Sequence, residues 1–86
     1  MTDNYYRKLG SYLRALRKDR YPNDTQTDFA YRIQVSKSTY IKMEKGDLSV
    51  SLNNYAEAAR LLGVDEQIIN IFKMPEKSSL ERLGHV

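Results

Sequence analysis

The sequence predicts an all-α fold of five helices, and three observations support this prediction. Apolar side chains recur in several separate segments with the 3.6-residue period of an amphipathic helix. Serine, threonine or aspartate precedes most of these segments, where its side chain can cap a helix N-terminus, and glycine follows two of them. We find no convincing segment with the two-residue alternation that is typical of a half-buried strand.

The first helix is indicated by apolar residues on one stripe, namely Tyr5, Leu9, Tyr12, Leu13 and Leu16. Basic residues lie outside this stripe, namely Arg7, Lys8, Arg14 and Lys18. Gly10 inside the pattern has two explanations. Either a neighbouring backbone packs closely against it, or the regular helix begins later, with Ser11 as its cap.

The second and third helices are short. Residues 21–24 interrupt the periodicity as a loop, and Thr25 or Asp24 can cap the second helix. The buried face of that helix is expected to contain Phe29, Ala30 and Ile33. Ser36 is expected to cap the third helix, and Gly46 to end it in the left-handed conformation.

The fourth helix is expected to begin after a Ser51 cap and to end at Gly63. Its predicted apolar face consists of Leu52, Tyr55, Ala56, Ala59 and Leu62. Asp65 is expected to cap a fifth helix that runs to about Phe72.

Composition favours a binding protein over an enzyme. The 86 residues can form one small core but are too few for a deep catalytic cleft. Cysteine is absent and the single histidine, His85, lies next to the C-terminus, so we expect no enzyme activity, no metal site and no cofactor. With no apolar span near the ~20 residues of a membrane helix and no leader-like N-terminus, we expect a cytoplasmic protein without membrane association.

Charge is distributed unevenly along the chain. Residues 1–20 carry six basic side chains against two acidic ones, whereas residues 47–72 carry one basic side chain against four acidic ones. This polarity suits a protein that lays one face on phosphates, although an ordinary solvated surface is an equally good explanation of charge alone.

Residues 25–46 predict two short helices joined by a tight turn, which is a geometry that proteins use to bind DNA. On a helical wheel the inner face of the third helix contains Thr39, Tyr40, Met43 and Glu44, and its outer face contains Lys37, Ser38, Ile41, Lys42 and Lys45. Lysines can meet guanine acceptors or phosphates, and a serine hydroxyl can pair with several base edges. Ile41 is either a lone exposed aliphatic or a contact to a thymine methyl group, and we favour the methyl contact.

Several motifs occur together in order and at near-family spacing: Leu9-Gly10, Leu13-Arg14-Ala15-Leu16-Arg17, Thr25-Gln26, Phe29-Ala30, Val35-Ser36-Lys37-Ser38-Thr39, Met43-Glu44-Lys45-Gly46, Ser51-Leu52 and Leu61-Leu62-Gly63-Val64. Through them, residues 9–72 resemble the lambda-repressor-like helix-turn-helix domain of the Xre family of bacterial and phage regulators. The resemblance implies a five-helix DNA-binding domain in which Gln26, Lys37, Ser38, Ile41 and Lys42 contact DNA. We add Thr27, Ser36 and Lys45 to this predicted contact set. It also implies a structural ion pair between Arg17 and Glu44.

The chain departs from the family pattern at two places. Gln34 occupies the turn position where the family usually has glycine, so we expect a strained or re-routed turn. The loop from Asp19 to Asp24 is longer than the common spacing, which leaves the angle of the first helix open. Residues 44–47, 50–52 and 55–56 also resemble small regulators encoded beside HipA-type toxin kinases.

The chain is expected to divide into a folded domain and a C-terminal tail. Residues 1–73 are predicted to form the DNA-binding domain and residues 74–86 a flexible tail. Within that tail, Ser78 to Glu81 matches a capping box, so one helical turn could dock through Leu80, Leu83 and Val86 or fray.

In the fifth helix, one face can bury Ile68, Ile71 and Phe72, which leaves Ile69 exposed. We therefore predict a homodimer interface at Ile69, Phe72 and Met74. The alternative is that the first and fourth helices bury both faces of the fifth helix.

These observations together predict a homodimeric transcriptional repressor that binds a palindromic operator in double-stranded DNA. The leading variant is an autoregulator of the antitoxin type that also binds a toxin protein, and a phage or plasmid repressor is its rival. A protein-interaction module that keeps the helix-turn-helix only as a scaffold is a third alternative.

Overall fold

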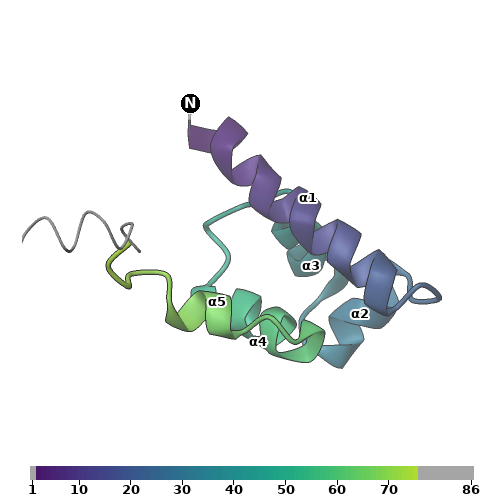
Figure 1. Ribbon diagram of the computed structural model, residues 1–86. Helices are drawn as coiled ribbons and strands as arrows, with labels where there is room; N and C mark the ends of the chain where they lie inside the picture. Colours follow the sequence, from purple (N-terminus) through teal and green to yellow (C-terminus); the bar gives the residue numbers. More distant parts are fainter. Residues whose placement is uncertain (1, 76–86) are drawn as a thin grey trace, which may run out of the picture.

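The computed structural model describes the backbone of residues 2–75 and the side chains of residues 6–75. The described part contains five α-helices and no strand, which confirms the all-α prediction. The helices are α1 (Thr2–Arg20), α2 (Gln26–Arg32), α3 (Lys37–Glu44), α4 (Leu52–Leu62) and α5 (Glu66–Ile69). Figure 1 shows α1 lying across one side of the molecule, with α4 and α5 along the opposite side.

The core lies where α2, α3 and α4 meet. Phe29, Tyr40 and Met43 are fully buried, and the Phe29 ring contacts the Tyr40 ring at a centroid distance of 5.2 Å. Buried residues from α4 complete this core, namely Tyr55, Ala58 and Leu62. From α1, Leu13 and Leu16 pack against it as partly buried residues. The helix-turn-helix pair is therefore held against α1 and α4 by a shared apolar core.

The predicted apolar stripe of α1 is too wide. Leu13 and Leu16 face the core, but Leu9 and Tyr12 are exposed, because no described element covers these two positions. Tyr12 lies about 160° around the helix from the side of α1 that packs against the end of α3. The side chain of Tyr5 lies outside the described part.

Gly10 lies inside α1, so the alternative of a helix that starts at Ser11 is wrong. A Cβ atom at Gly10 would stand 2.3 Å from the Glu44 carbonyl oxygen and 2.5 Å from the Gly46 nitrogen. The other explanation, a closely packed neighbouring backbone, is confirmed.

The predicted caps of α2, α3 and α4 are confirmed. Thr25, rather than Asp24, caps α2: its hydroxyl oxygen accepts from the Asp28 amide at 3.1 Å, and the Asp28 carboxylate accepts from the Thr25 amide at 3.0 Å. Ser36 and Ser51 cap α3 and α4 through their hydroxyl oxygens. Gly46 and Gly63 follow the ends of α3 and α4 in the left-handed conformation, with φ of 76° and 80°.

The predictions for α4 and α5 need correction. In α4, Leu52 is exposed and Ala56 half-buried, while Ala58 joins the buried set, because the buried face is rotated by about 50° around the helix axis, away from Leu52 and Ala56 and toward Ala58. In α5, Asp65 has helical backbone angles and makes no side-chain cap.

The helix α5 ends at Ile69 instead of Phe72, although separate turns continue to Lys73. Ile71 and Phe72, expected to face the domain, are exposed. None of the residues of α5 is buried, so no core contact supports a longer helix.

The boundary between a domain and a tail after Lys73 remains a prediction, and the predicted turn at residues 78–81 lies outside the described residues. Within residues 2–75, no helix is long and apolar enough to cross a membrane.

Candidate nucleic-acid interface

The turn between α2 and α3 is tight and strained. The Val35 amide donates to the Ala30 carbonyl at 3.0 Å, and the Gln34 amide donates to the Tyr31 carbonyl at 3.1 Å, so the chain reverses within a few residues. Gln34 itself has a φ of 61°, which costs an L-residue with a side chain about 1 kcal/mol or more. The strain expected from the missing glycine is confirmed.

Helix α3 has the two faces that the wheel predicts. Tyr40 and Met43 are fully buried, and Thr39 is half-buried. Glu44 is half-buried as a whole residue, although its side chain is almost fully buried. On the opposite face Lys37, Ser38, Lys42 and Lys45 are exposed, while Ile41 is half-buried. The exposed face can meet a duplex without disturbing the core, but which of these residues contact DNA stays a prediction.

Three hydroxyl groups gather at the start of α3. The Ser36 oxygen accepts from the Thr39 amide at 3.1 Å, and its hydroxyl donates to Thr39 Oγ1 at 2.9 Å. The Ser38 hydroxyl lies 3.2 Å from that of Ser36. Ser36 caps the helix, whereas the exposed side chains of Lys37 and Ser38 at this end do not take part in the cap.

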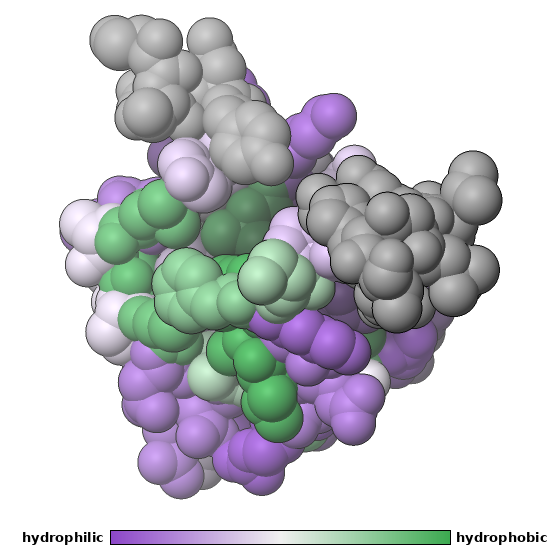
Figure 2. All heavy atoms as spheres, turned by 60° about the vertical axis from the view of Figure 1, so that its left-hand side comes forward, coloured by the Kyte–Doolittle hydropathy of each residue, from purple (hydrophilic) through white to green (hydrophobic). Residues whose placement is uncertain are grey.

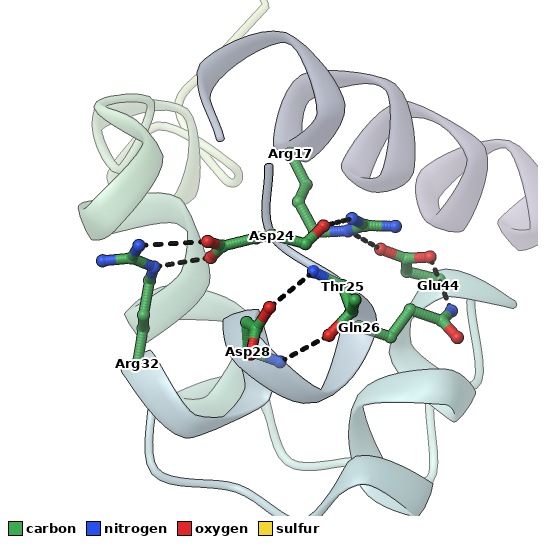
Figure 3. A network of polar contacts seen from close by, with 7 residues as sticks. All are labelled: Arg17, Asp24, Thr25, Gln26, Asp28, Arg32 and Glu44. Carbon is green, nitrogen blue, oxygen red and sulfur yellow. Dashed lines mark hydrogen bonds and ion pairs between the residues drawn. The ribbon is translucent and has the colours of Figure 1, made fainter. Parts of the chain in front are cut away.

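A polar network joins α1, α2 and α3 (Figure 3). Arg17 Nε donates to Glu44 Oε2 at 2.7 Å, and the other carboxylate oxygen, Oε1, accepts from Gln26 Nε2 at 2.9 Å. Arg17 also donates through Nη1 to the Asp24 carbonyl at 2.9 Å. The Arg17 and Glu44 side chains are only 5% and 4% exposed, so the predicted ion pair is confirmed and is almost fully buried.

Electrostatics in this network favour the charged pair. Burial by itself would raise the pKa of the Glu44 carboxyl, but hydrogen bonds from Arg17 and Gln26 hold that pKa below its ordinary value. The Tyr40 hydroxyl lies beside the pair, and burial raises its pKa, so it stays protonated at neutral pH. Gln26, a predicted DNA contact, therefore begins α2 with its amide group fixed by a buried carboxylate.

A second polar cluster fixes the loop before α2. The Arg32 guanidinium binds the Asp24 carboxylate through two contacts of 2.5 and 3.0 Å and lies 4.5 Å from the centre of the Tyr21 ring. The hydrogen bond from Arg32 holds the pKa of Asp24 below its ordinary value. In addition, Arg20 donates to the Leu62 carbonyl at the end of α4.

These contacts of Arg20, Asp24 and Arg32 are absent from the sequence-based interpretation. They join positions that are 8 and 42 residues apart, across a loop whose path the sequence does not fix, so no local spacing predicts them.

Thr27 is the member of the predicted contact set that lies apart from Gln26. It is exposed and lines a shallow open hollow with Tyr31, Gln34 and Leu61. One residue along a helix rotates a side chain by about 100°, so Thr27 and Gln26 point in different directions. Among residues 2–75, no group of three or more acidic, histidine or cysteine side chains could hold a metal ion.

The predicted dimer residues are all exposed. Ile69, Phe72 and Met74 are 75%, 93% and 77% exposed, and Ile71 is exposed beside them. Figure 2 shows hydrophobic side chains gathered on the face of the molecule that carries α5 and the chain that follows it. The alternative in which α1 and α4 bury both faces of α5 is therefore wrong for the single chain.

Two short helices joined by a tight turn, the second with a buried apolar face and an exposed basic face, define a helix-turn-helix DNA-binding domain. A family model described as "Helix-turn-helix domain" matches residues 8–68, and the chain belongs to this family. Neither the curated proteins nor the solved structures gave a match. The family supports a DNA-binding regulator, while the Xre and HipA-linked assignments remain predictions.

Proposed function

We propose that this protein is a homodimeric repressor of the Xre type that binds a palindromic operator. The observation that carries the proposal is that α3 is held in a fixed position while its basic face is exposed. Its inner face is locked in the core by Tyr40 and Met43, its end is fixed by the Arg17–Glu44 pair, and its outer face exposes Lys37, Ser38, Lys42 and Lys45. A rigid helix with a free basic face fits the major groove.

In the proposed mechanism, the protein acts through the place on DNA where it binds. α3 enters the major groove, where Lys37 and Ser38 meet base edges and Lys42 and Lys45 meet bases or phosphates. Gln26 and the start of α2 contact the phosphate backbone beside the groove. Repression follows because a protein bound across a promoter excludes RNA polymerase.

Support for a dimer comes from the exposed apolar residues after α4. Soluble monomers rarely expose a contiguous apolar patch of this kind, and a second copy of the chain could cover it through a two-fold axis. The two α3 helices would then address half-sites one turn of DNA, about 34 Å, apart.

Antitoxin-type autoregulation is the form of this function that we favour. Its support is the resemblance of residues 44–47, 50–52 and 55–56 to regulators encoded beside HipA-type toxin kinases, and it makes a toxin protein a second partner. A phage or plasmid repressor uses the same DNA contacts. A pure protein-interaction module differs from both, since it would show little salt-dependent DNA binding.

The experiment selects an operator from random duplexes and then compares variants by footprinting and salt titration. Lys37→Ala and Ser38→Ala should each weaken operator binding by about 1–3 kcal/mol and relax base preference locally. Lys45→Ala should weaken all sequences alike and flatten the salt slope by about 1.

Lys8→Ala, an exposed lysine on α1 away from α3, is the control and should change neither property. Unchanged operator affinity in both the Lys37 and Ser38 variants would show that α3 does not contact the bases.

A further inference from the structure

A stripe of basic residues on α1 has no role in the DNA contacts proposed for α2 and α3. It consists of Arg7, Arg14 and Lys18, which are all exposed. At 3.6 residues per turn, these positions lie within roughly 40° of one another around the helix and extend over about 16 Å of its length. Several phosphates of one DNA strand fit within that length, because they recur every ~3.4 Å of helix axis.

The position of Gly10 places this stripe relative to α3. Its backbone touches the backbone at Glu44 and Gly46, so the residue between those two, Lys45, lies beside α1 at this crossing. On the wheel Arg14 and Arg7 lie about 40° and 60° from Gly10 in the same direction, one before and one after the crossing. The two arginines therefore bracket the segment that carries Lys45.

The opposite flank of α1 faces the rest of the domain. Leu13 and Leu16 lie on the other side of Gly10 and pack against the core, and Arg20 reaches the end of α4. Arg17 lies between the two flanks and connects to Glu44 and, through it, to Gln26. The basic stripe thus lies on the flank of α1 opposite its core-facing residues, next to the crossing that brings Lys45 beside α1.

The described acidic side chains nearest to this stripe have partners of their own, and Asp19, next to Lys18, pairs with Arg20 at 3.6 Å. The carboxylates of Glu44, Asp24 and Asp28 are engaged by Arg17 and Gln26, by Arg32, and by the Thr25 amide. Asp47 accepts from the Ser49 amide at the start of the following loop.

We propose that Arg7, Arg14 and Lys18 form an additional phosphate-binding surface, which extends DNA contact from the helix-turn-helix onto α1. This inference rests on the proposed function. It adds that α1, which lies outside the helix-turn-helix, binds phosphates of the DNA backbone. Phosphate contacts of this kind raise affinity for every sequence and carry no base preference.

The test compares two charge-matched double variants in binding a mixed-sequence 30-base-pair duplex and the selected operator over a range of salt. Arg7→Gln with Arg14→Gln removes two charges from the stripe. Lys8→Gln with Arg60→Gln removes two charges from exposed positions elsewhere, and circular dichroism verifies that both variants fold.

The stripe variant should lose the same factor of affinity on both duplexes, and its plot of log K against log salt should become shallower by nearly 2, about 0.9 for each lost contact. Adding Lys18→Gln should flatten it further. The control should keep the wild-type slope.

Equal slopes in the two variants would overturn the inference, because the effect would then reflect net charge alone or nothing at all. Wild-type protein that binds no duplex would overturn the proposed function together with this inference, whereas wild-type binding with an unchanged slope in the stripe variant overturns the inference only.

Discussion

The helix-turn-helix unit and the C-terminal segment (residues 65–75) differ in how many of their helix ends and apolar side chains find partners within a single chain. In the unit, α2 and α3 are capped by side chains and their apolar faces are buried, and the buried ion pair that joins α3 to α1 has further hydrogen-bond partners. In the C-terminal segment the helix has four residues, lacks a side-chain cap and is followed by exposed apolar residues.

This difference separates two tasks. A base-contacting surface must be rigid before DNA arrives, since ordering it on binding would cost affinity. A surface for a second copy gains its stabilisation on assembly, so it can remain incomplete in the single chain. The following predictions test this contrast, beginning with the largest expected effect.

The buried pair should give the largest change in stability. Arg17→Ala or Glu44→Ala strands a buried charge and should lower the free energy of unfolding by about 3–5 kcal/mol. Removing both should cost less than the worse single change, which urea unfolding of all four proteins measures. A coupling energy below ~0.3 kcal/mol, the scatter of independent sites, would show that the two residues do not interact.

Acid should remove the same stabilisation. The pKa of Glu44 is lower in the folded state than its ordinary value of 4.5, so the pair stabilises the fold above that pH and loses its effect as pH falls through the folded pKa. The stability difference between wild type and Glu44→Ala should therefore shrink below about pH 4.5. A difference that is constant from pH 7 to pH 2 would contradict this.

A charge placed in the C-terminal segment should break assembly and leave the fold intact. Ile69→Glu buries a carboxylate at the proposed two-fold interface and should weaken self-association at least a hundredfold, or about 3 kcal/mol. Sedimentation and circular dichroism should show a folded monomer that binds a half-site weakly. Tyr31→Glu, an exposed aromatic on α2, is the matched control and should remain a dimer. An Ile69→Glu protein that remains a dimer with native helicity would exclude this interface.

At Gly10 the packing should reverse the usual effect of a helical glycine. Alanine at an open helical position stabilises by up to about 1 kcal/mol, but here its Cβ would meet the backbone of Glu44 and Gly46. Gly10→Ala should instead destabilise by about 1–3 kcal/mol in thermal unfolding. The neighbouring exposed Ser11→Ala should be neutral or stabilising, and equal behaviour of the two variants would disprove the close crossing of α1 and α3.

The smallest effect is expected at the strained turn. Gln34→Gly relieves a left-handed side-chain conformation at the cost of a more flexible unfolded chain, so it should stabilise by about 0.5–1 kcal/mol. Gln34→Ala keeps the strain and should give no such gain. If alanine and glycine stabilise equally, the gain comes from removing the glutamine side chain and not from the backbone.

The sequence by itself determined the features that depend on neighbouring residues. The order of the five helices, the caps at Thr25, Ser36 and Ser51, and the left-handed glycines are local, and each was predicted correctly. The two faces of α3 followed from the wheel for the same reason, and the Arg17–Glu44 pair followed from the resemblance to a known family.

Only the tertiary structure decided which parts of those patterns are buried. Leu9, Tyr12 and Leu52 fit an apolar stripe but are exposed, because burial requires an opposing element and none covers these positions. The crossing at Gly10, the Arg32–Asp24 clamp and the Gln26–Glu44 bond join segments that the sequence separates. α5 stopped at Ile69 because its apolar residues find no core within the single chain, a consequence of packing that periodicity does not encode.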